Sequence, residues 1–517
     1  MRKHRNENTV AQDALQQMTP AVQSIIPLDR DLKNSDHECM FEAIDPDEET
    51  RLVRKIDLVI LPIMAFVYLF QYIDKNSINN AAVFGLRKDC SLNGEQFSWV
   101  VSLFYFGQLV SEYPAAYLLS RFRVTTFIGA TIVVWGVVEM TNGAPHDFPG
   151  FAASRFFLGL SEGAVSPAFV IITSLWYRRE EHPMRVAAWI SMNGVSQIVG
   201  PLLMYAIGGS RIAVASWRAL FLVCGGITVM FGIAFVFMMP KDTTTAWFLN
   251  ARERELATRR LAIDRSTRER SEFNKAQMWE ALKSPLTWFY FAFAICVMLT
   301  APILKFSSQI INGFGYDKFY TMLLGTPSGA ISFAAIWVSA LGPRIFPNSR
   351  IYTTIFLALV QLSGSVVLLF VPVRNGNAWA IVAATWLASS VSAPFCGVTA
   401  LVASNVKGNT KKSIVSVGFF ISYCVGAIVS PLAWTENDAP RYIKGCILSI
   451  VSLICLIILL LLYLFIVTRI NKKRDALAVH PHGERYQTAI EAEGMQRGLS
   501  LDSDLTDEQD MGFRYSI

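Results

Sequence analysis

The sequence predicts an all-α membrane protein whose twelve membrane-spanning helices form two bundles of six. Three observations predict this fold. Hydrophobic residues make up 53% of the 517 residues and charged residues only 17%, below the roughly 25% of an average soluble domain. Twelve apolar segments reach the length of a spanning helix, about 20 residues. A charged stretch, 240–283, separates the first six segments from the last six.

The twelve segments follow one another with short polar connections. They lack the alternating pattern of barrel strands, which excludes β-strands as the main element. We expect spans at 56–84, 95–120, 124–143, 149–176, 183–208, 216–239, 285–312, 318–341, 350–373, 377–405, 412–434 and 440–468.

This pattern divides the chain into five parts. An N-terminal bundle (56–239) and a C-terminal bundle (284–468) are joined by a linker (240–283), which we interpret as a solvated amphipathic helix on the cytosolic face. The polar tails, 1–55 and 469–517, are typical of disordered or regulatory segments.

Basic residues predict the orientation. Arg51, Arg54 and Lys55 directly precede the first span and favour a cytosolic N-terminus. An even number of spans then places the C-terminus in the cytosol as well. The first 30 residues contain no long apolar stretch, so we expect an uncleaved first span in place of a secretory signal peptide.

Several classes of protein are excluded. No GxxxxGK[ST] loop could cradle a nucleotide phosphate, and no HExxH, GxSxG or Cys/His cluster indicates an enzyme, a metal site or a cofactor. The net charge of +6 is not gathered into a basic domain, so nucleic acid is not expected as a partner. A six-plus-six membrane protein without a nucleotide site indicates secondary transport.

Five motifs carry a resemblance to a known family. They are RFFLGLSEGAVSPAF (155–169), Asp74-Lys75-Asn76 in FQYIDKNSINNAAVFG, IINGFGY (310–316), ASNVKGNTKKS (403–413) and DAPRY (438–442). Together they resemble the fungal allantoate permease family, within the anion:cation symporters of the major facilitator superfamily. The resemblance covers roughly 51–470. Ser120 stands where the superfamily usually has Asp in the loop after the second helix, so the usual gating charge is absent from that position.

The resemblance implies the major facilitator fold, with two bundles related by a pseudo-twofold axis. It also implies proton-coupled uptake of a small organic anion, such as a carboxylate, a vitamin or a ureide-like acid, by a multi-pass protein of the plasma membrane. We expect a monomer surrounded by lipid. Export of an acidic secondary metabolite and a non-transporting nutrient sensor are the alternatives.

Charged residues inside the spans indicate the site. They are Asp74, Lys75, Glu112, Glu139, Arg155, Glu162 and Lys305. A charge at the middle of a bilayer costs about 2.5–3.5 kcal/mol on insertion scales, so such residues usually face a cavity or a partner. Arg155 precedes Glu162 by seven residues, or about 10 Å along one face of a helix.

These positions lead to role assignments. Lys75, Arg155 and Lys305 are predicted to bind the anion, because cationic donors can replace the water around a carboxylate. Glu162 and Asp74 are predicted to carry protons, since burial favours the neutral acid. Packing ion pairs, and a Lys305 that extends to the outer surface, are the alternatives.

The remaining polar residues have weaker assignments. Glu112 is predicted to be a conformational (gating) partner of arginines at the inner face, and Glu139 to be solvated near an outer helix end. Asn193, Gln197 and Asn312 are additional candidates for substrate binding, although each could equally be a helix–helix hydrogen bond.

Overall fold

The computed structural model describes residues 45–211, 213–266, 273–371, 378–434, 438–439, 441–479 and 504–517. The chain divides into two units, residues 1–52 and 53–517, and the fold and the candidate site belong to the second. Most of the predicted N-terminal tail, up to residue 44, and residues 480–503 of the predicted C-terminal tail lie outside the described residues.

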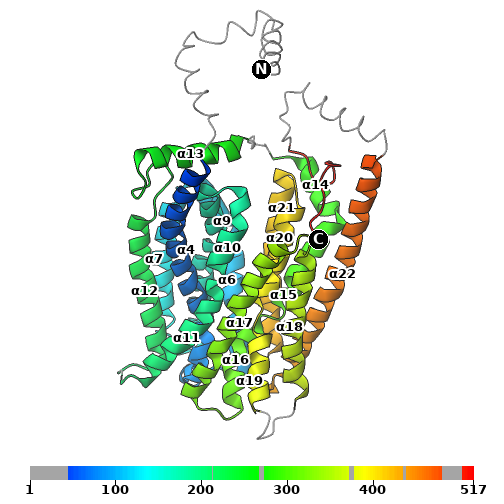
Figure 1. Ribbon diagram of the computed structural model, residues 1–517. Coiled ribbons are helices and arrows are strands. Elements are labelled where there is room, and N and C mark those ends of the chain that lie inside the picture. Colours follow the sequence, from blue (N-terminus) through cyan, green and yellow to red (C-terminus); the bar gives the residue numbers. More distant parts are fainter. Residues whose placement is uncertain are drawn as a thin grey trace, which may run out of the picture. The chain divides into compact units, whose positions relative to one another are not determined.

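Helices build the second unit, and its described residues contain no strand (Figure 1). The N-terminal bundle comprises α4 (Pro46–Val83), α6 (Gly94–Arg121), α7 (Val124–Thr141), α8 (Phe148–Glu162) with α9 (Val165–Trp176), α10 (His182–Ile190) with α11 (Met192–Gly209), and α12 (Ser216–Met238). The C-terminal bundle comprises α15 (Pro285–Met298) with α16 (Pro302–Gly313), α17 (Lys318–Ile345), α18 (Arg350–Phe370), α19 (Ala378–Ala388) with α20 (Ser392–Asn405), α21 (Asn409–Val429), and α22 (Ile443–Val479).

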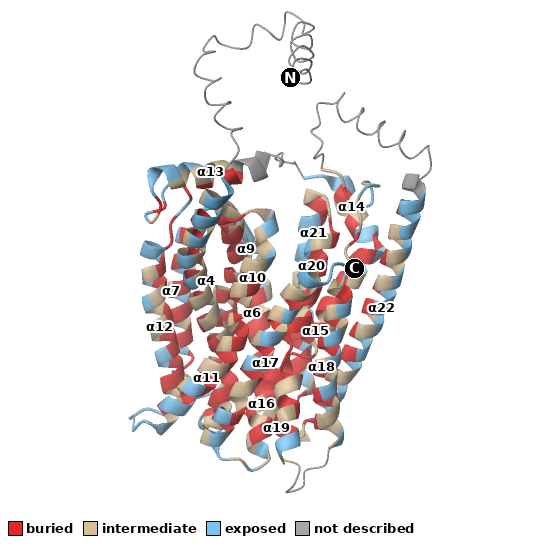
Figure 2. Ribbon diagram, viewed as in Figure 1, coloured by how far each residue is buried: buried red, intermediate tan, exposed pale blue. Residues whose placement is uncertain are grey.

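The predicted fold class is confirmed. Among the described residues, 11 helical stretches are long and apolar enough to cross a membrane. The predicted span 95–120 corresponds to α6, a helix of 28 residues that is not among these 11 and that carries Gln108 and Glu112 within its length. It packs against α8 in its own bundle and α21 in the other, so protein shields its polar side chains from lipid. Exposed residues occur along α12 and α22 (Figure 2), and large apolar side chains such as Phe237 on α12 are among them, as lipid contact requires.

Four spans that the sequence suggests as single helices are interrupted near their middle. The breaks separate α8 from α9, α10 from α11, α15 from α16, and α19 from α20. Pro302 begins α16, where a residue without an N–H group is tolerated. At the first break Gly163 lies so close to α6 that an added Cβ would meet Ser111 Oγ at 1.9 Å. This break leaves Glu162 as the last residue of α8.

The positions of the linker helices distinguish the two ends of the bundles, whichever end lies in the cytosol. We call the end of the bundles that carries α13 (Ala251–Ser266) and α14 (Lys275–Lys283) the linker face, and the opposite end the loop face (Figure 1). At the loop face, Asn93, Asp147 and Asp317 cap the first turns of α6, α8 and α17 with side-chain oxygens, which satisfies free backbone N–H groups.

The linker contains two helices that belong to different bundles, where the sequence suggested one. On α13, Glu253 pairs with Lys55 of α4 at 2.7 Å, and Arg260 pairs with Glu181. On α14, Glu280 pairs with Lys411 of α21 at 2.9 Å. Each half of the linker therefore caps its own bundle.

Residues 504–517 pack on the C-terminal bundle, so the expectation of a disordered tail is wrong for them. Lys411, only 2% exposed, reaches Asp507 at 2.9 Å and Glu508 at 3.3 Å. Asn405 donates to the Ser516 carbonyl at 3.0 Å, and Ser516 N donates back to Asn405 Oδ1 at 2.7 Å. Acidic residues of this segment supply counter-ions for a buried lysine.

The closest approach between the bundles is the crossing of α11 and α17. A Cβ added to Gly329 would lie 2.4 Å from the carbonyl oxygen of Gly194, and one added to Gly194 would lie 2.6 Å from Phe333 N. These are backbone atoms, which no side-chain rotation can move away. The crossing therefore requires glycine on both helices.

We predict that Gly329→Ala abolishes most transport by preventing this approach, because overpacking costs about 1–3 kcal/mol and here opposes one conformation only. The measurement is cysteine labelling from the loop face, at Ser308→Cys, together with uptake. The control is Gly226→Ala on α12, where nothing lies within 4 Å of an added Cβ. Normal uptake and unchanged labelling in Gly329→Ala would contradict the prediction.

Candidate functional site

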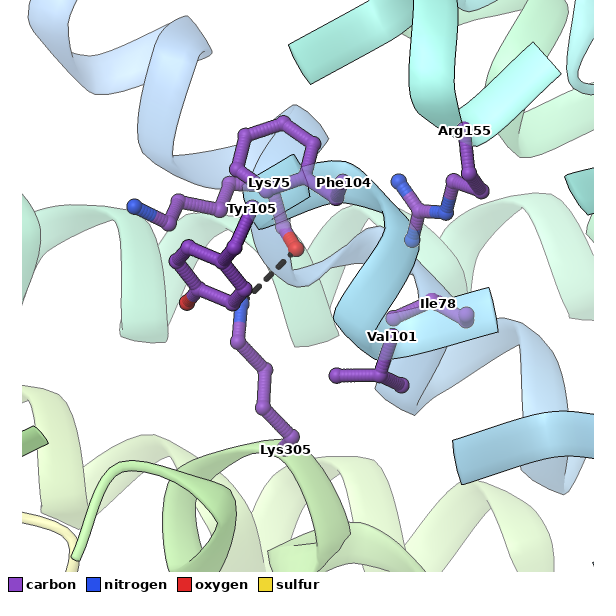
Figure 3. Close-up of a pocket in the computed structure, with 7 residues that line it drawn as sticks. All are labelled: Lys75, Ile78, Val101, Phe104, Tyr105, Arg155 and Lys305. Atoms are coloured by element: carbon purple, nitrogen blue, oxygen red, sulfur yellow. Dashed lines mark hydrogen bonds between the residues drawn. The ribbon is translucent and has the colours of Figure 1, made fainter. Parts of the chain in front are cut away.

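Three cations from two bundles line one buried cavity (Figure 3). Lys75 comes from α4, Arg155 from α8 and Lys305 from α16. Its other walls are Ile78, Val101, Phe104 and Tyr105. These three cations are the residues that the sequence predicts to bind the anion, and the fold brings them together.

Lys305 ties the two bundles to each other. Its ammonium donates to the Lys75 carbonyl at 2.8 Å and to Asn76 Oδ1 at 2.5 Å. The residue is only 5% exposed, which rules out the alternative that it extends to the surface. Two of its three donors are thus held by the end of α4, and one remains for another acceptor.

Lys75 lies among aromatic rings. Its ammonium donates to Tyr423 Oη at 2.9 Å and lies 4.9 Å from the Tyr105 ring centroid and 5.4 Å from that of Phe104. The face of an aromatic ring attracts a cation. In Figure 3 the ammonium extends away from Arg155, so the two charges occupy different parts of the cavity wall.

Arg155 is the least satisfied of the three cations. The residue is 1% exposed, yet Nε and Nη1 have no hydrogen-bond partner. Its guanidinium carbon lies 5.9 Å from the Phe151 ring centroid and 6.0 Å from that of Phe221. A buried guanidinium with free donors is suited to bind an anion by donating charge-assisted hydrogen bonds to it.

Three carboxyl groups surround this guanidinium without closing an ion pair to it. Glu139, Glu162 and Asp74 lie near enough to Arg155 to act on it electrostatically. Neither carboxyl oxygen of Glu162 has a hydrogen-bond partner, although Gln71 lies beside it. Asp74 accepts from Thr228 Oγ1 on α12 at 3.3 Å, and its other oxygen is unpartnered. The adjacent residues Asp74 and Lys75 thus face different helices. Asp74 faces the other acids and α12, whereas Lys75 faces the cavity.

A second cavity, of about 390 Å³ empty volume, lies beside the first between α4, α11, α16 and α17. Its polar lining is uncharged and consists of Asn76, Asn79, Asn80, Ser196, Gln197, Ser307, Ser308 and Ser328. Gln197 accepts from Ser332 Oγ of α17 at 3.3 Å. Asn193 is buried outside this lining, and its Oδ1 has no partner.

The loop-face ends of the bundles are sealed against each other. Asn79 donates to Ser308 Oγ at 3.0 Å, Ser102 to the Ile428 carbonyl at 2.8 Å, and Ser98 to the Trp434 carbonyl at 3.1 Å. Apolar residues of both bundles, such as Phe97, Phe306 and Trp434, form one buried cluster there. Access from the loop face therefore requires these contacts to break.

Glu139 differs from its expected position. The sequence suggested a solvated side chain, but it is fully buried and accepts from Asn142 Nδ2 at 2.9 Å and from Ser77 Oγ at 3.4 Å. The reason is close packing of α7 on α12, where an added Cβ on Gly136 would lie 2.8 Å from Val229 N. The glycines in α7 and α12 are the sequence feature from which this close packing could have been predicted.

Two further expectations need correction. Glu112 forms no ion pair with an arginine among the described residues; it is half-buried near Cys424 of α21, and its Oε2 is unpartnered. Asn312 lines neither cavity, and its amide donates to the Tyr316 carbonyl at 3.0 Å. Sequence position alone could not separate this helix-end contact from a binding group.

Known proteins resemble this chain over most of its length. The Major Facilitator Superfamily profile matches residues 64–431. An uncharacterized transporter of Schizosaccharomyces pombe, C757.13, is 34% identical over 90% of this chain and 87% of its own. Allantoate permease of Saccharomyces cerevisiae is 31% identical over 92% of this chain and 88% of its own. Thiamine pathway transporter THI73 of the same yeast is 29% identical over 90% and 86%.

Solved structures show the same fold. The xylose transporter XylE from E. coli, in a partially occluded inward open conformation, superposes with a TM-score of 0.58 at 11% identity, covering 78% of this chain and 97% of that one. A bacterial homolog of the human lysosomal transporter Spinster gives a TM-score of 0.54 at 13% identity, covering 78% and 96%.

The contrast between Gln197 and Asn312 gives a testable prediction. A lost neutral hydrogen bond is worth about 0.5–1.5 kcal/mol, so Gln197→Ala should raise the apparent KM for the transported compound about 2- to 10-fold. Asn312→Ala removes only a helix-end contact and should change KM by about twofold or less. The measurement is initial uptake rate against concentration, corrected for surface expression. The reverse order of the two effects would contradict the placement of these residues.

Proposed function

Because the chain belongs to the Major Facilitator Superfamily, which the match to residues 64–431 shows, we propose that it is a proton-coupled transporter of a small organic anion that works by alternating access. The observation that supports this proposal most strongly is the buried cavity lined by Lys75, Arg155 and Lys305. Three cations would repel a cationic substrate, and together they can replace the water around a carboxylate. The likeness to allantoate permease supports the same substrate class.

The roles of the charged residues follow in this proposal. Arg155 binds the carboxylate through its guanidinium group, while Lys75 and the free donor of Lys305 supply further positive charge. Glu162 and Asp74 carry protons, because they are buried acids with unpartnered oxygens beside Arg155. Lys305 bonds to α4 across the bundle interface, so occupancy of the cavity is linked to closure of the loop face.

The cellular setting belongs to the same proposal. We infer uptake across a plasma membrane by a monomer whose two termini lie in the cytosol, so that the linker face is cytosolic. The basic residues before the first span favour this orientation. The sealed loop face then corresponds to a state that is closed to the outside.

Labelled uptake in a permease-deficient yeast tests the proposal. The panel contains allantoate, nicotinate and pantothenate as carboxylates and thiamine as a cation, each at pH 5 and pH 7. Accumulation of at least one carboxylate, stronger at pH 5 and abolished by a protonophore, is the expected result. Accumulation of thiamine alone would overturn the anion assignment, and faster efflux than uptake under the same gradient would indicate an exporter.

Arg155 gives the sharpest prediction about binding. Arg155→Lys should lose most transport and Arg155→Ala nearly all, because a bidentate contact becomes a point charge or disappears. The measurements are apparent KM and maximal rate, with surface expression followed separately. A normal apparent KM in Arg155→Ala would remove Arg155 from the binding site.

Glu162→Gln separates exchange from accumulation. The amide mimics the protonated acid, so the variant should still exchange labelled for unlabelled substrate across the membrane. It should fail to accumulate substrate in response to a pH gradient, because it has no proton to release. Accumulation at the wild-type level in this variant would move the coupling role to Asp74.

A further inference from the structure

Asn76 is a polar residue without a role in the transport mechanism proposed above. It follows Lys75 on α4, and its amide nitrogen donates to the Tyr72 carbonyl one turn earlier at 2.9 Å. Its amide oxygen accepts from the Lys305 ammonium of α16 at 2.5 Å. An ammonium group only donates hydrogen bonds, so the oxygen is the atom that has to face Lys305. The side chain is thus anchored on its own helix and directed at the other bundle.

Lys305 reaches the anion site by crossing the interface between the bundles. Lys75 and Arg155 belong to the N-terminal bundle, whereas Lys305 belongs to the C-terminal bundle. In Figure 3 its side chain extends from α16 to the Lys75 carbonyl, which accepts from the ammonium at 2.8 Å. Two acceptors of α4 therefore fix the ammonium against the N-terminal bundle, and its third N–H remains for another acceptor.

The same stripe of α4 carries part of the loop-face seal. Residues 76, 79 and 80 share one face of the helix by their spacing. Asn79 donates to Ser308 Oγ at 3.0 Å, and Ser308 donates to Asn80 Oδ1 at 3.3 Å. Lys305 and Ser308 are likewise one turn apart on α16. Because both sets of contacts join α4 to α16, opening of the loop face separates the two stripes and also pulls Lys305 away from Asn76.

We propose that Asn76 is a positioning residue that holds Lys305 in the anion site only while the loop face is closed. In the closed conformation Asn76 keeps the third cation beside Lys75 and Arg155. In a loop-open conformation Lys305 moves away with its own bundle, and two cations remain. The anion then binds the closed conformation more tightly, and by linkage it favours closure by the same factor. The inference rests on the proposed anion transport and adds to it the conformation in which the site is complete.

Two substitutions of Asn76 separate this role from a purely structural one. Asn76→Ala removes the acceptor, so it should weaken both closure of the loop face and binding of the anion. Asn76→Asp keeps the shape and supplies a carboxylate, which holds Lys305 more firmly and neutralises its charge. This variant should stay closed at the loop face and still bind the anion about tenfold more weakly. If Asn76 only stabilised α4, closure and binding would change together in both variants.

Hydrogen–deuterium exchange of the purified full chain measures closure without substrate. In Asn76→Ala, residues 96–104 near the loop-face end of α6 should exchange faster than in wild type, and residues 113–121 at its linker-face end more slowly. Opposite changes at the two ends of one helix indicate a change of conformation, because unfolding would increase exchange at both ends. Unchanged or uniformly faster exchange in Asn76→Ala would overturn the inference.

Two further variants complete the exchange measurement. Asn76→Asp should exchange no faster than wild type at residues 96–104, and faster exchange there would contradict the proposed hold on Lys305. The matched control is Asn471→Ala on α22, which removes a hydrogen bond to the Tyr515 carbonyl on the C-terminal bundle. It joins no residues of different bundles and should match wild type at both ends of α6.

Equilibrium binding to the purified protein is the second measurement, and its labelled probe is whichever of allantoate, nicotinate and pantothenate wild type accumulates. Asn76→Ala should raise the dissociation constant about fivefold or more. In a Lys305→Met background the same substitution should change it by less than about twofold, because Asn76 acts through Lys305. Equal effects of Asn76→Ala in the two backgrounds would refute the positioning role.

The same probe tests the linkage between binding and closure. Its addition to wild type should slow exchange at residues 96–104, and faster exchange there would mean that the anion favours the open conformation. If wild type accumulates none of the three compounds, the proposed function fails and the anion-binding part of the inference falls with it. The exchange measurement without substrate then still decides whether Asn76 holds the loop face closed.

Discussion

A guanidinium buried among helices without an ion-pair partner is the constraint on which the site depends. Arg155 is 1% exposed, and a charge removed from water must be compensated by its surroundings. The compensation here is distributed over Asp74, Glu139 and Glu162, none of which bonds to it. A tight salt bridge would occupy the hydrogen-bond donors of Arg155, which could then no longer bind a substrate. Distributed compensation keeps its donors available.

The same arrangement explains why the cations belong to different bundles. Lys305 reaches across to the end of α4, and Lys75 reaches across to Tyr423 of α21. Both lysines line the cavity, and both contacts join the two bundles, so a ligand that engages these lysines also alters the contacts that hold the bundles together. The ammonium groups of Lys75 and Lys305 therefore take part both in substrate binding and in the contacts between the bundles.

Much of this architecture could be predicted from the sequence. Apolar segment lengths fix the number of spans, and the rarity of charge inside a membrane is enough to identify Lys75, Arg155 and Lys305 as candidates. The burial of Glu139 could not be predicted in this way, because it depends on how closely α7 and α12 approach. The breaks in four spans, and the packing of residues 504–517 around Lys411, likewise depend on tertiary contacts that local sequence does not specify.

The divided linker has a consequence for how the two halves hold together. Since α13 is bonded to the N-terminal bundle and α14 to the C-terminal bundle, these ion pairs do not hold the two bundles together. That falls to the glycine crossing of α11 and α17 and to the loop-face seal. If the chain were divided into two polypeptides, 1–266 and 273–517, the first would keep α13 and the second α14. Each would also keep its side of the α11–α17 crossing and of the loop-face seal. The two bundles of the single chain therefore associate through the same kinds of contact as two subunits of a complex.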